Sequence, residues 1–417
     1  MNNLKVGFFL ATRQLRRSSI WATTLIVLVM ALTFLNLVLV SGILVGLIEG
    51  IRIAYEEEYS GNILITQYTN KQYIEQSQSI IKTLEGIPEI EAFSARYKEG
   101  GTMEAGFKEK TNQADVPNRV SATLIGIDPE EEDKTTNLSS LIIAGEYLER
   151  GDERFVIVGA DLLEKYSRFV GAGADFLLFL KDADVGSEVR IAVNGIEKDV
   201  IIKGIIQSKV DQVSTRVYFS DREFRKIIGR SNLNVDEIAI KLYDREDANR
   251  VKRILLATGA GEFGMIQTSE ESQGSFFNDI KRTFNILGSA IGSIGLAVAS
   301  ITIFIVIFIN AISRRKYIGI MKGIGINGRA IEISYVLQSI AYAVIGTLLG
   351  LTLLYGVLVP FFMKNPINFP FSDGILVAPV GQTAIRILLL FITTLTAGYI
   401  PARIIIRKNT LDSILGR

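Results

Sequence analysis

The stretch that decides the fold runs from Ile20 to Ile48 and reads IWATTLIVLVMALTFLNLVLVSGILVGLI, 29 residues without one charge. At about 1.5 Å of rise per residue, a helix of this length is longer than the bilayer hydrocarbon core, which is about 30 Å thick. A signal peptide is the alternative, but its apolar region has only about 7 to 15 residues and a small-residue cleavage site follows it. No such site precedes Glu49. We therefore predict an uncleaved membrane-spanning helix.

Three further apolar segments follow near the C-terminus, at 284–312, 333–359 and 380–399. A buried core helix is the alternative for each, but the first two are too long for that to be the better interpretation. Arg386 interrupts the last segment. We predict four spans in all, one before and three after a long polar region.

Lys and Arg gather beside these segments, which sets the expected orientation. Cytoplasmic flanks of membrane helices are enriched in these residues. The flanks contain Lys5, Arg13, Arg16, Arg17, Arg314, Arg315, Lys316, Lys322, Arg329, Arg403, Arg407, Lys408 and Arg417. We expect a multi-pass protein of the inner (cytoplasmic) membrane with both termini and the loop 313–332 in the cytoplasm. Residues 1–48 and 284–417 hold 15 basic and 3 acidic residues, so the total charge of +1 divides into a basic membrane part and an acidic outer part.

Residues 49–283 read as a domain in which strand-like and helix-like patterns alternate. Strands are expected at 62–67, 120–127, 154–159, 189–193, 199–206, 216–219 and 237–242. Helices are expected at 71–84 and 162–166, around Phe224 and after Asp244, with a turn at Asp128–Pro129. Asn194–Gly195 is typical of a hairpin turn, with its register left open. The predicted fold class is an α-helical membrane protein with four transmembrane helices (1 + 3) and a large extracytoplasmic α+β domain of small mixed sheets.

Three domains follow from these patterns. They are residues 1–48 with the first span, 49–283 as the outer domain, and 284–417 with three spans and the cytoplasmic loop 313–332.

The composition excludes several kinds of chemistry. With no His and no Cys, the chain has no Ser-His-Asp or Cys-His pair, no zinc finger and no disulfide. No G-x-x-x-x-G-K-[ST] loop is present for ATP. Acid runs at 56–58 and 130–133 are expected on the solvated surface, because consecutive carboxylates point in different directions. No aromatic and basic stripe indicates nucleic-acid binding, and we expect no catalytic residue, no metal and no bound cofactor.

The loop 313–332 carries an apolar stripe that membrane anchoring alone does not explain. Ile318, Met321 and Ile324 recur at i, i+3 and i+6 beside basic residues. Such a stripe lies in the membrane interface or docks in the groove of a partner.

Several motifs resemble one family. Residues 314–325, RRKYIGIMKGIG, are similar to R-R-K-E-I-G-I-L-[KR]-A-I-G of the FtsX/MacB-like permeases of ABC transporters. The segment 335–350, YVLQSIAYAVIGTLLG, resembles the opening of that family's third helix, and 398–415, GYIPARIIIRKNTLDSIL, resembles its tail. The N-terminal LATRQLRRSS at 10–19 is similar to the family's A-x-R-x-L-R. The order of motifs at 123–133, 155–166 and 218–228 is most like the lipoprotein-releasing, LolC/LolE-like branch with its MacB-like periplasmic core domain.

The resemblance implies a mechanism. A separate ATPase, in two copies, binds the cytoplasmic loop as a coupling helix, and ATP and Mg stay on that partner. Here the ATPase-coupling residues would be Arg315, Lys316, Ile318, Gly319, Met321, Lys322, Ile324 and Gly325. A second permease subunit, either a copy or a paralogue, membrane lipid, and a lipoprotein or periplasmic protein are the other implied partners.

The sequence also departs from the family pattern. Tyr317 stands where the family has Glu, and residues 409–412 replace its Pro-x-Glu. The compact segment 188–208 has no long insertion of the kind with which LolC hooks a chaperone. An FtsX-like regulator of a cell-wall hydrolase, a MacB-like efflux permease and an anchored sensor without an ATPase stay open as alternatives.

Within the spans, two features are candidates for function. Gly288 and Gly292, and likewise Gly346 and Gly350, are spaced for close helix approach. Arg386 is an ionisable residue inside a span and therefore a candidate for function, although we favour snorkelling toward the nearby membrane surface.

Overall fold

The computed structural model describes residues 3–18, 20–108, 117–170, 178–313, 315–369, 372–374 and 376–406. The chain divides into two compact units. The helical unit consists of Met1–Ile48, Asp279–Asn368 and Asp373–Arg417. The sheet unit consists of Glu49–Asn278 and Phe369–Ser372.

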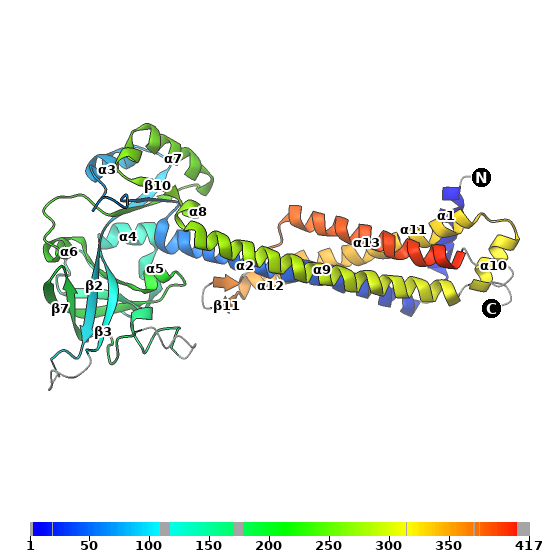
Figure 1. Cartoon of the computed structure of the whole chain (residues 1–417), viewed down its shortest axis with the longest axis horizontal. Helices are drawn as coiled ribbons and strands as arrows, with labels where there is room; N and C mark the ends of the chain where they lie inside the picture. Colours follow the sequence, from blue (N-terminus) through cyan, green and yellow to red (C-terminus); the bar gives the residue numbers. More distant parts are fainter. Residues whose placement is uncertain are drawn as a thin grey trace. The chain divides into compact units, whose positions relative to one another are not determined.

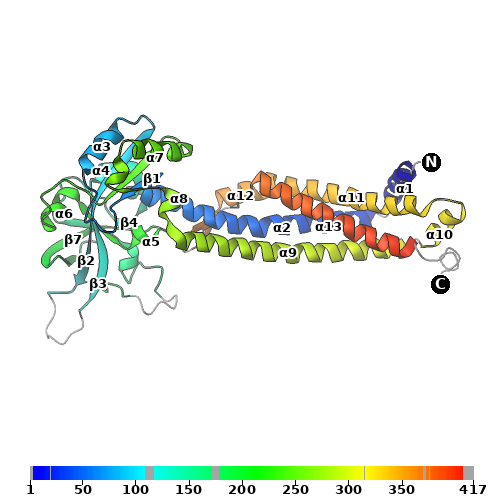
Figure 2. The same cartoon turned by 45° about the horizontal axis from the view of Figure 1, so that its top comes forward.

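Within the described residues, four helices are long and apolar enough to cross a membrane, and they overlap the four predicted segments. The helices that enter the helical unit are α1 (Asn3–Arg16), α2 (Ile20–Tyr55), α9 (Gly274–Ser313), α10 (Arg315–Gly323), α11 (Gly328–Leu353), the π-helical turn η6 (Leu354–Leu358), α12 (Val359–Lys364) and α13 (Val380–Ile406). Strands β11 (Ile367–Phe369) and β12 (Ser372–Gly374) form a separate ribbon. Figures 1 and 2 show α2, α9, α11 and α13 running side by side.

The core of the helical unit is built from side chains of three of these helices. Phe34 of α2, Tyr335 of α11 and Leu390 of α13 are at most 2% exposed and belong to one apolar cluster. The short helix α1 packs on α11, where Gly7 lies so close to Ile333 that a Cβ atom would come within 2.6 Å of it. The span-like segments therefore form one packed bundle.

The sheet unit is built on one ten-stranded mixed sheet, in the order β10-β1-β9-β2-β3-β8-β5-β7-β4 with β6 beside β2 and β7. The strands are β1 (Ile63–Thr66), β2 (Ile90–Ala105), β3 (Arg119–Ile127), β4 (Ile142–Gly145), β5 (Phe155–Gly159), β6 (Glu188–Val193), β7 (Ile196–Ile206), β8 (Arg216–Ser220), β9 (Glu237–Leu242) and β10 (Met265–Thr268). The expectation of several small sheets was wrong. The reason is β2, whose 16 residues pair with β9 in the first half and with β3 in the second, so that one strand joins two groups.

Short helices connect these strands. They are η1 (Glu56–Ser60), α3 (Ser77–Glu85), α4 (Pro129–Thr136), η2 (Leu138–Leu141), η3 (Ala160–Leu162), α5 (Asp211–Ser214), α6 (Asp221–Ile227), η4 (Arg245–Asp247), α7 (Ala248–Ala257), η5 (Ala260–Glu262) and α8 (Ser269–Ser272). Two sequence predictions fail here. The helix expected from residue 71 begins only at Ser77, because Gln76 adopts a left-handed φ of 50°. No α-helix covers 162–166, because Leu163 is extended and forms a bridge with Leu180.

Both faces of the sheet are covered, which explains why strands such as FVIVG are apolar throughout. Val156 and Val158 of β5 point into one cluster of buried side chains, and Ile157 between them points into another. The second cluster also contains Tyr59. The end of the first long helix thus contributes to the core of the sheet unit.

The predicted hairpin is confirmed and its register is fixed. Asn194 and Gly195 both have positive φ angles, of 50° and 79°, as a two-residue turn of type I′ requires. Val193 therefore pairs directly with Ile196, and the ladder continues to Glu188 opposite Ile201.

Candidate functional site

The predicted coupling loop folds as a helix with a defined end. α10 closes with Gly325 at φ 91°, a left-handed conformation that glycine adopts without strain. The N–H of Gly325 donates to the carbonyl of Lys322, and that of Ile326 donates to Met321, both at 3.0 Å. This double contact is the Schellman arrangement at a helix C-terminus. Asn327 then caps α11 by accepting a hydrogen bond from the N–H of Arg329.

One face of α10 is buried in the bundle, so part of the predicted docking surface was wrong. Ile318 is 1% exposed and packs in the same cluster as Ile331 and Ile406. Gly319 is also buried, and Met321 is half-buried against that cluster. Because its side chain is enclosed by the bundle, Ile318 is a core residue and is not available as a docking contact here.

Another face of α10 is open. Tyr317 and Ile320 of α10 and Ile324, which directly follows its last residue, are 68%, 44% and 73% exposed, and they recur at i, i+3 and i+7. Lys316 is exposed next to them. We call Tyr317, Ile320 and Ile324 the open face of α10. The sequence reading missed Tyr317 and Ile320, although their spacing was a usable signal.

The remaining predicted coupling residues differ in their surroundings. Lys322 donates from Nζ to the carbonyl of Ile406 at 2.9 Å, which ties α10 to the end of α13. The side chain of Arg315 lies outside the described part of the structure, as does the whole of Arg314. The coupling role of these residues stays a prediction.

The two glycine pairs both face α2. A Cβ atom on Gly346 would lie 2.4 Å from Cβ of Met30, and one on Gly350 would lie 2.5 Å from the ring of Phe34. A Cβ atom added at Gly288 or Gly292 would lie 3.4 Å from the nearest leucine methyl group of α2, which is an ordinary van der Waals distance. Of these four positions, Gly346 and Gly350 therefore require glycine, and Gly288 and Gly292 do not.

Arg386 has a partner inside the bundle. Its Nη2 donates to the hydroxyl of Ser41 on α2 and, at 3.3 Å, to Oε1 of Gln382. Snorkelling was favoured from the sequence, and the structure instead places this hydrogen bond between α13 and α2.

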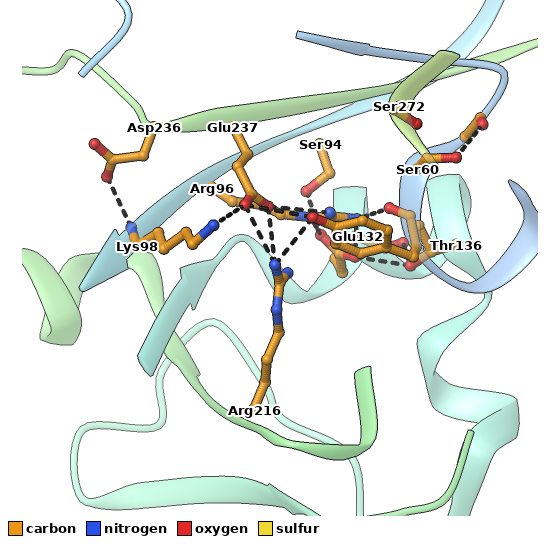
Figure 3. A network of polar contacts seen from close by, with 12 residues as sticks. Ser60, Ser94, Arg96, Lys98, Glu132, Thr136, Arg216, Asp236, Glu237 and Ser272 are labelled. Carbon is orange, nitrogen blue, oxygen red and sulfur yellow. Dashed lines mark hydrogen bonds and ion pairs between the residues drawn. The ribbon is translucent and has the colours of Figure 1, made fainter. Parts of the chain in front are cut away.

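A second candidate site lies in the sheet unit, where charged side chains are buried together (Figure 3). Arg96 of β2 and Arg216 of β8 meet Glu132 of α4 and Glu237 of β9, and all four side chains are at most 4% exposed. The ring of Tyr59 lies against both guanidinium groups, at 5.4 Å from Arg96 and 4.6 Å from Arg216. We call these five residues the buried cluster.

The charges of the buried cluster stabilise one another. Burial alone would raise the pKa of Glu237, but Arg216, Lys98 and Arg96 together lower it to about 2. Burial likewise opposes the ionised form of Glu132, and Arg96 lowers its pKa nonetheless. Both carboxylates are therefore ionised at neutral pH, and the cluster contains two cations and two anions.

Next to the buried cluster, Asp236 is in a different electrostatic situation. Its Oδ2 accepts from the backbone N–H of Lys98 at 2.7 Å and from Arg230 Nη1 at 2.6 Å, while its Oδ1 has no hydrogen-bond partner among the described residues. Burial raises the pKa of Asp236 to about 6, with Arg230 opposing the shift.

These sites can be compared with known proteins. A family model described as FtsX-like permease C-terminal matches residues 289–410. The macrolide export ATP-binding/permease protein MacB of Agrobacterium fabrum is 23% identical over 194 residues, 45% of this chain and 28% of the relative. The protein of the same name from Bdellovibrio bacteriovorus is 27% identical over 139 residues, 31% of this chain and 21% of the relative. The chain contains an FtsX-like permease segment and is similar to MacB-like permeases; it is called the permease below.

The permease spans less than a third of the length of these two curated relatives. The matched segment includes α10, Gly292, the Gly346 and Gly350 pair and Arg386, whereas Gly288 and the Glu49–Asn278 part of the sheet unit lie outside it. A crystal structure of the periplasmic region of MacB from Actinobacillus actinomycetemcomitans aligns with 52% of the permease and 94% of that chain, at 16% identity and a TM-score of 0.36. Among the residues that the structure describes, the permease therefore combines four helices long and apolar enough to cross a membrane with a separate α+β unit.

The buried cluster is a second feature of the permease that was not predicted from the sequence. Glu132 and Glu56 belong to the acid runs expected in solvent, yet they are 1% and 9% exposed, so that expectation was wrong for both. Arg216 and Glu237 each begin an apolar strand, whereas Arg96 lies in β2 among other charged residues. The charges of Arg216 and Glu237 at the start of apolar strands were therefore the usable signal.

The chemistry of the cluster does not indicate a metal site. Among residues 3–18, 20–108, 117–170, 178–313, 315–369, 372–374 and 376–406, no three Asp or Glu side chains are grouped so that they could hold a metal ion. Each cluster carboxylate instead binds a guanidinium.

Proposed function

We propose that this permease is the membrane subunit of a mechanotransmitting ABC transporter, with ATP and Mg bound by a separate ATPase. The open face of α10 is the observation that carries the proposal. Three large apolar side chains stand exposed beside Lys316 on a helix that joins two spans of an FtsX-like permease domain. Apolar anchors at i, i+3 and i+7 are the pattern by which a helix fits into the groove of a partner.

The orientation supports the same proposal. The basic flanks of the spans favour a cytoplasmic location for the two termini and α10, where ATP is available. The sheet unit then lies outside an inner membrane, at the substrate side. We propose two ATPase copies and a second permease subunit, either a copy or a paralogue, because the resemblance to the family implies a paired arrangement.

The proposed substrate is an amphiphile such as a lipoprotein, extracted from or exported across the inner membrane. The resemblance of the outer-domain motifs to the lipoprotein-releasing branch supports this choice. The names of the two relatives, macrolide export proteins, favour a second candidate, efflux of a small amphiphilic compound. Co-purifying molecules identified by mass spectrometry separate the two, since a lipoprotein and a macrolide-sized compound differ greatly in mass. An envelope hydrolase recovered with the permease, and no transported substrate, would favour an FtsX-like regulator.

The test of the proposal is recovery of an ATPase with tagged permease from native membranes in mild detergent. The variant Ile320→Glu places a charge on the open face and is expected to reduce ATPase recovery at least ten-fold. Ile143→Glu is the matched control, because Ile143 of β4 is 46% exposed against 44% for Ile320 but lies in the sheet unit. Equal recovery with both variants would refute the docking surface, and no ATPase with the unmodified permease would refute the proposed function.

A further inference from the structure

The chain enters and leaves the sheet unit at two short elements that are bonded to each other. It enters through η1, directly after α2, and leaves through α8, directly before α9. The hydroxyl of Tyr55 donates to the carbonyl of Ser272 at 3.3 Å, and the hydroxyl of Ser60 donates to that of Ser269 at 3.0 Å. More than 200 residues separate the partners of each pair in sequence. The residues at the end of α2 and in η1 are therefore hydrogen-bonded to α8, which directly precedes α9.

The same entry point is held by the buried cluster through Tyr59. The backbone carbonyl of Tyr59 accepts a hydrogen bond from Arg96 Nη2 at 2.7 Å. Its hydroxyl accepts from Arg216 Nη2 at 3.1 Å and donates to Glu237 Oε1 at 3.4 Å. Figure 3 shows Arg96, Arg216 and Glu237 converging from separate strands. Three strands, β2, β8 and β9, therefore hold one residue of η1.

The charges make this attachment specific in geometry. A buried guanidinium must stay with its carboxylate, because separating the pair leaves an uncompensated charge in a medium of low dielectric constant. Arg96 and Arg216 are additionally fixed by the ring of Tyr59, which lies within 6 Å of both guanidinium carbons. A displacement of η1 would have to move these two arginines or break their bonds. Among the cluster's neighbours, Lys98 is 38% exposed and binds Glu237 at 2.7 Å, so the network also reaches solvent.

We propose that Tyr59, Arg96, Arg216 and Glu237, together with the Ser60–Ser269 contact, form the joint that carries movement of α2 and α9 into the sheet. The inference rests on the proposed function, in which ATP binding moves the membrane helices. The four residues are positioning residues, since they act on the sheet through contacts and touch no reactant. A cluster that only stabilises the fold would have no effect on how the sheet responds to nucleotide.

The first experiment tests the attachment itself, by hydrogen exchange on full-length permease in nanodiscs. Tyr59→Phe removes only the hydroxyl and keeps the ring between the arginines. We expect amide exchange at 55–62 to rise at least ten-fold, with less than a two-fold change in β5 and β7. Tyr147→Phe is the matched control, because it removes the hydroxyl that donates to the carbonyl of Pro129 at 3.0 Å in the same unit. Unchanged exchange at 55–62, or an equal rise throughout the sheet, would overturn the inference.

The second experiment tests transmission with the permease and its ATPase together, with and without a non-hydrolysable ATP analogue. In the unmodified protein and in Tyr147→Phe, nucleotide is expected to change exchange in the sheet strands. In Arg216→Met and in the milder variant Ser60→Ala, that difference is expected to fall by more than half while ATPase recovery stays unchanged.

The outcomes separate the two claims. If no ATPase is recovered with any form of the permease, the proposed function fails. If the ATPase is recovered and both variants respond to nucleotide as fully as the unmodified protein, the joint is refuted.

Discussion

Arg96 binds both oxygens of the Glu132 carboxylate, with Nε 2.8 Å from Oε2 and Nη2 2.7 Å from Oε1, and neither side chain is more than 2% exposed. The hydroxyl groups of Ser94 and Thr136 donate to the same carboxylate, at 2.6 and 2.7 Å. Two-pronged ion pairs of this kind combine charge with fixed geometry. The acid run that begins α4 is thereby attached to β2, and one of its four acids is structural.

Replacing one partner of this pair is expected to be strongly destabilising. Arg96→Met leaves Glu132 buried without its cation and should lower the free energy of unfolding by about 3–5 kcal/mol. Thermal unfolding of the detergent-solubilised permease measures the effect. Adding Glu132→Leu should restore part of the loss, because a buried pair replaced by apolar groups leaves no lone charge. Arg150→Met, at an exposed arginine paired with the same acid run, is the control and should unfold like the unmodified protein. Equal effects of Arg96→Met and Arg150→Met would contradict this account.

The packing of α11 on α2 predicts a difference between two glycines of the same span. Gly346→Ala places a methyl group 2.4 Å from Cβ of Met30 and should destabilise the bundle by about 1–3 kcal/mol through overpacking. Gly356→Ala meets nothing within 4 Å and should be neutral or slightly stabilising, because alanine favours helix. The midpoint of thermal unfolding distinguishes them. Indistinguishable midpoints would show that the two helices can separate without loss.

The two sides of α10 predict opposite effects for two isoleucines six residues apart. Ile318→Ala removes a fully buried side chain and should cost about 2–5 kcal/mol of stability. Ile324→Glu changes a side chain that is 73% exposed and should leave unfolding unchanged while reducing ATPase recovery. Thermal unfolding and affinity recovery are measured on the same preparations. A loss of stability with Ile324→Glu would mean that the open face is covered within the bundle.

The pKa of Asp236 predicts an unusual pH dependence of stability. Its folded pKa of about 6 lies above the ordinary value of 3.8, so protonation favours the folded state. This contribution is complete below about pH 4 and is lost as the pH rises through 6. Relative to Asp236→Asn, the unmodified permease should therefore gain stability when the pH falls from 7.5 to 5. Unfolding midpoints of both proteins across this range make the comparison, and parallel curves would disprove the shift.

Glu237 provides the internal control for that experiment. Its pKa is lowered to about 2 from 4.5, so its stabilising effect is present above pH 4.5 and is lost only as the pH falls further. Glu237→Gln should thus be less stable than the unmodified permease by a constant amount between pH 5 and 7.5.

The spans could be predicted from sequence because a bilayer imposes a length and an absence of charge that a single segment must satisfy. The hairpin at Asn194 could be predicted for a similar reason, since a two-residue turn depends on local φ angles. The joining of two strand groups through β2 could not, because pairing partners such as Ile90 and Leu242 lie far apart in the chain.

In the candidate sites, too, features that depend on local sequence could be predicted, and features that depend on distant contacts could not. The helical form of the coupling segment followed from its own residues, but which face of it stays open depends on where α11 and α13 pack. Ile318 was therefore assigned to the wrong side. The partners of the buried charges were beyond reach for the same reason, since 36 residues separate Arg96 from Glu132 and 21 separate Arg216 from Glu237.

The turn η1 between Tyr55 and Gly61 is π-helical, so its hydrogen bonds span five residues instead of the four spanned in the α-helix that precedes it. Each residue of an α-helix advances the chain by about 100° around the axis. Deleting one of the three consecutive glutamates would return the turn to α-helical winding and rotate Tyr59 away from its arginines by about that angle. The number of glutamates in η1, more than their charge, therefore determines the direction about the helix axis in which Tyr59 points.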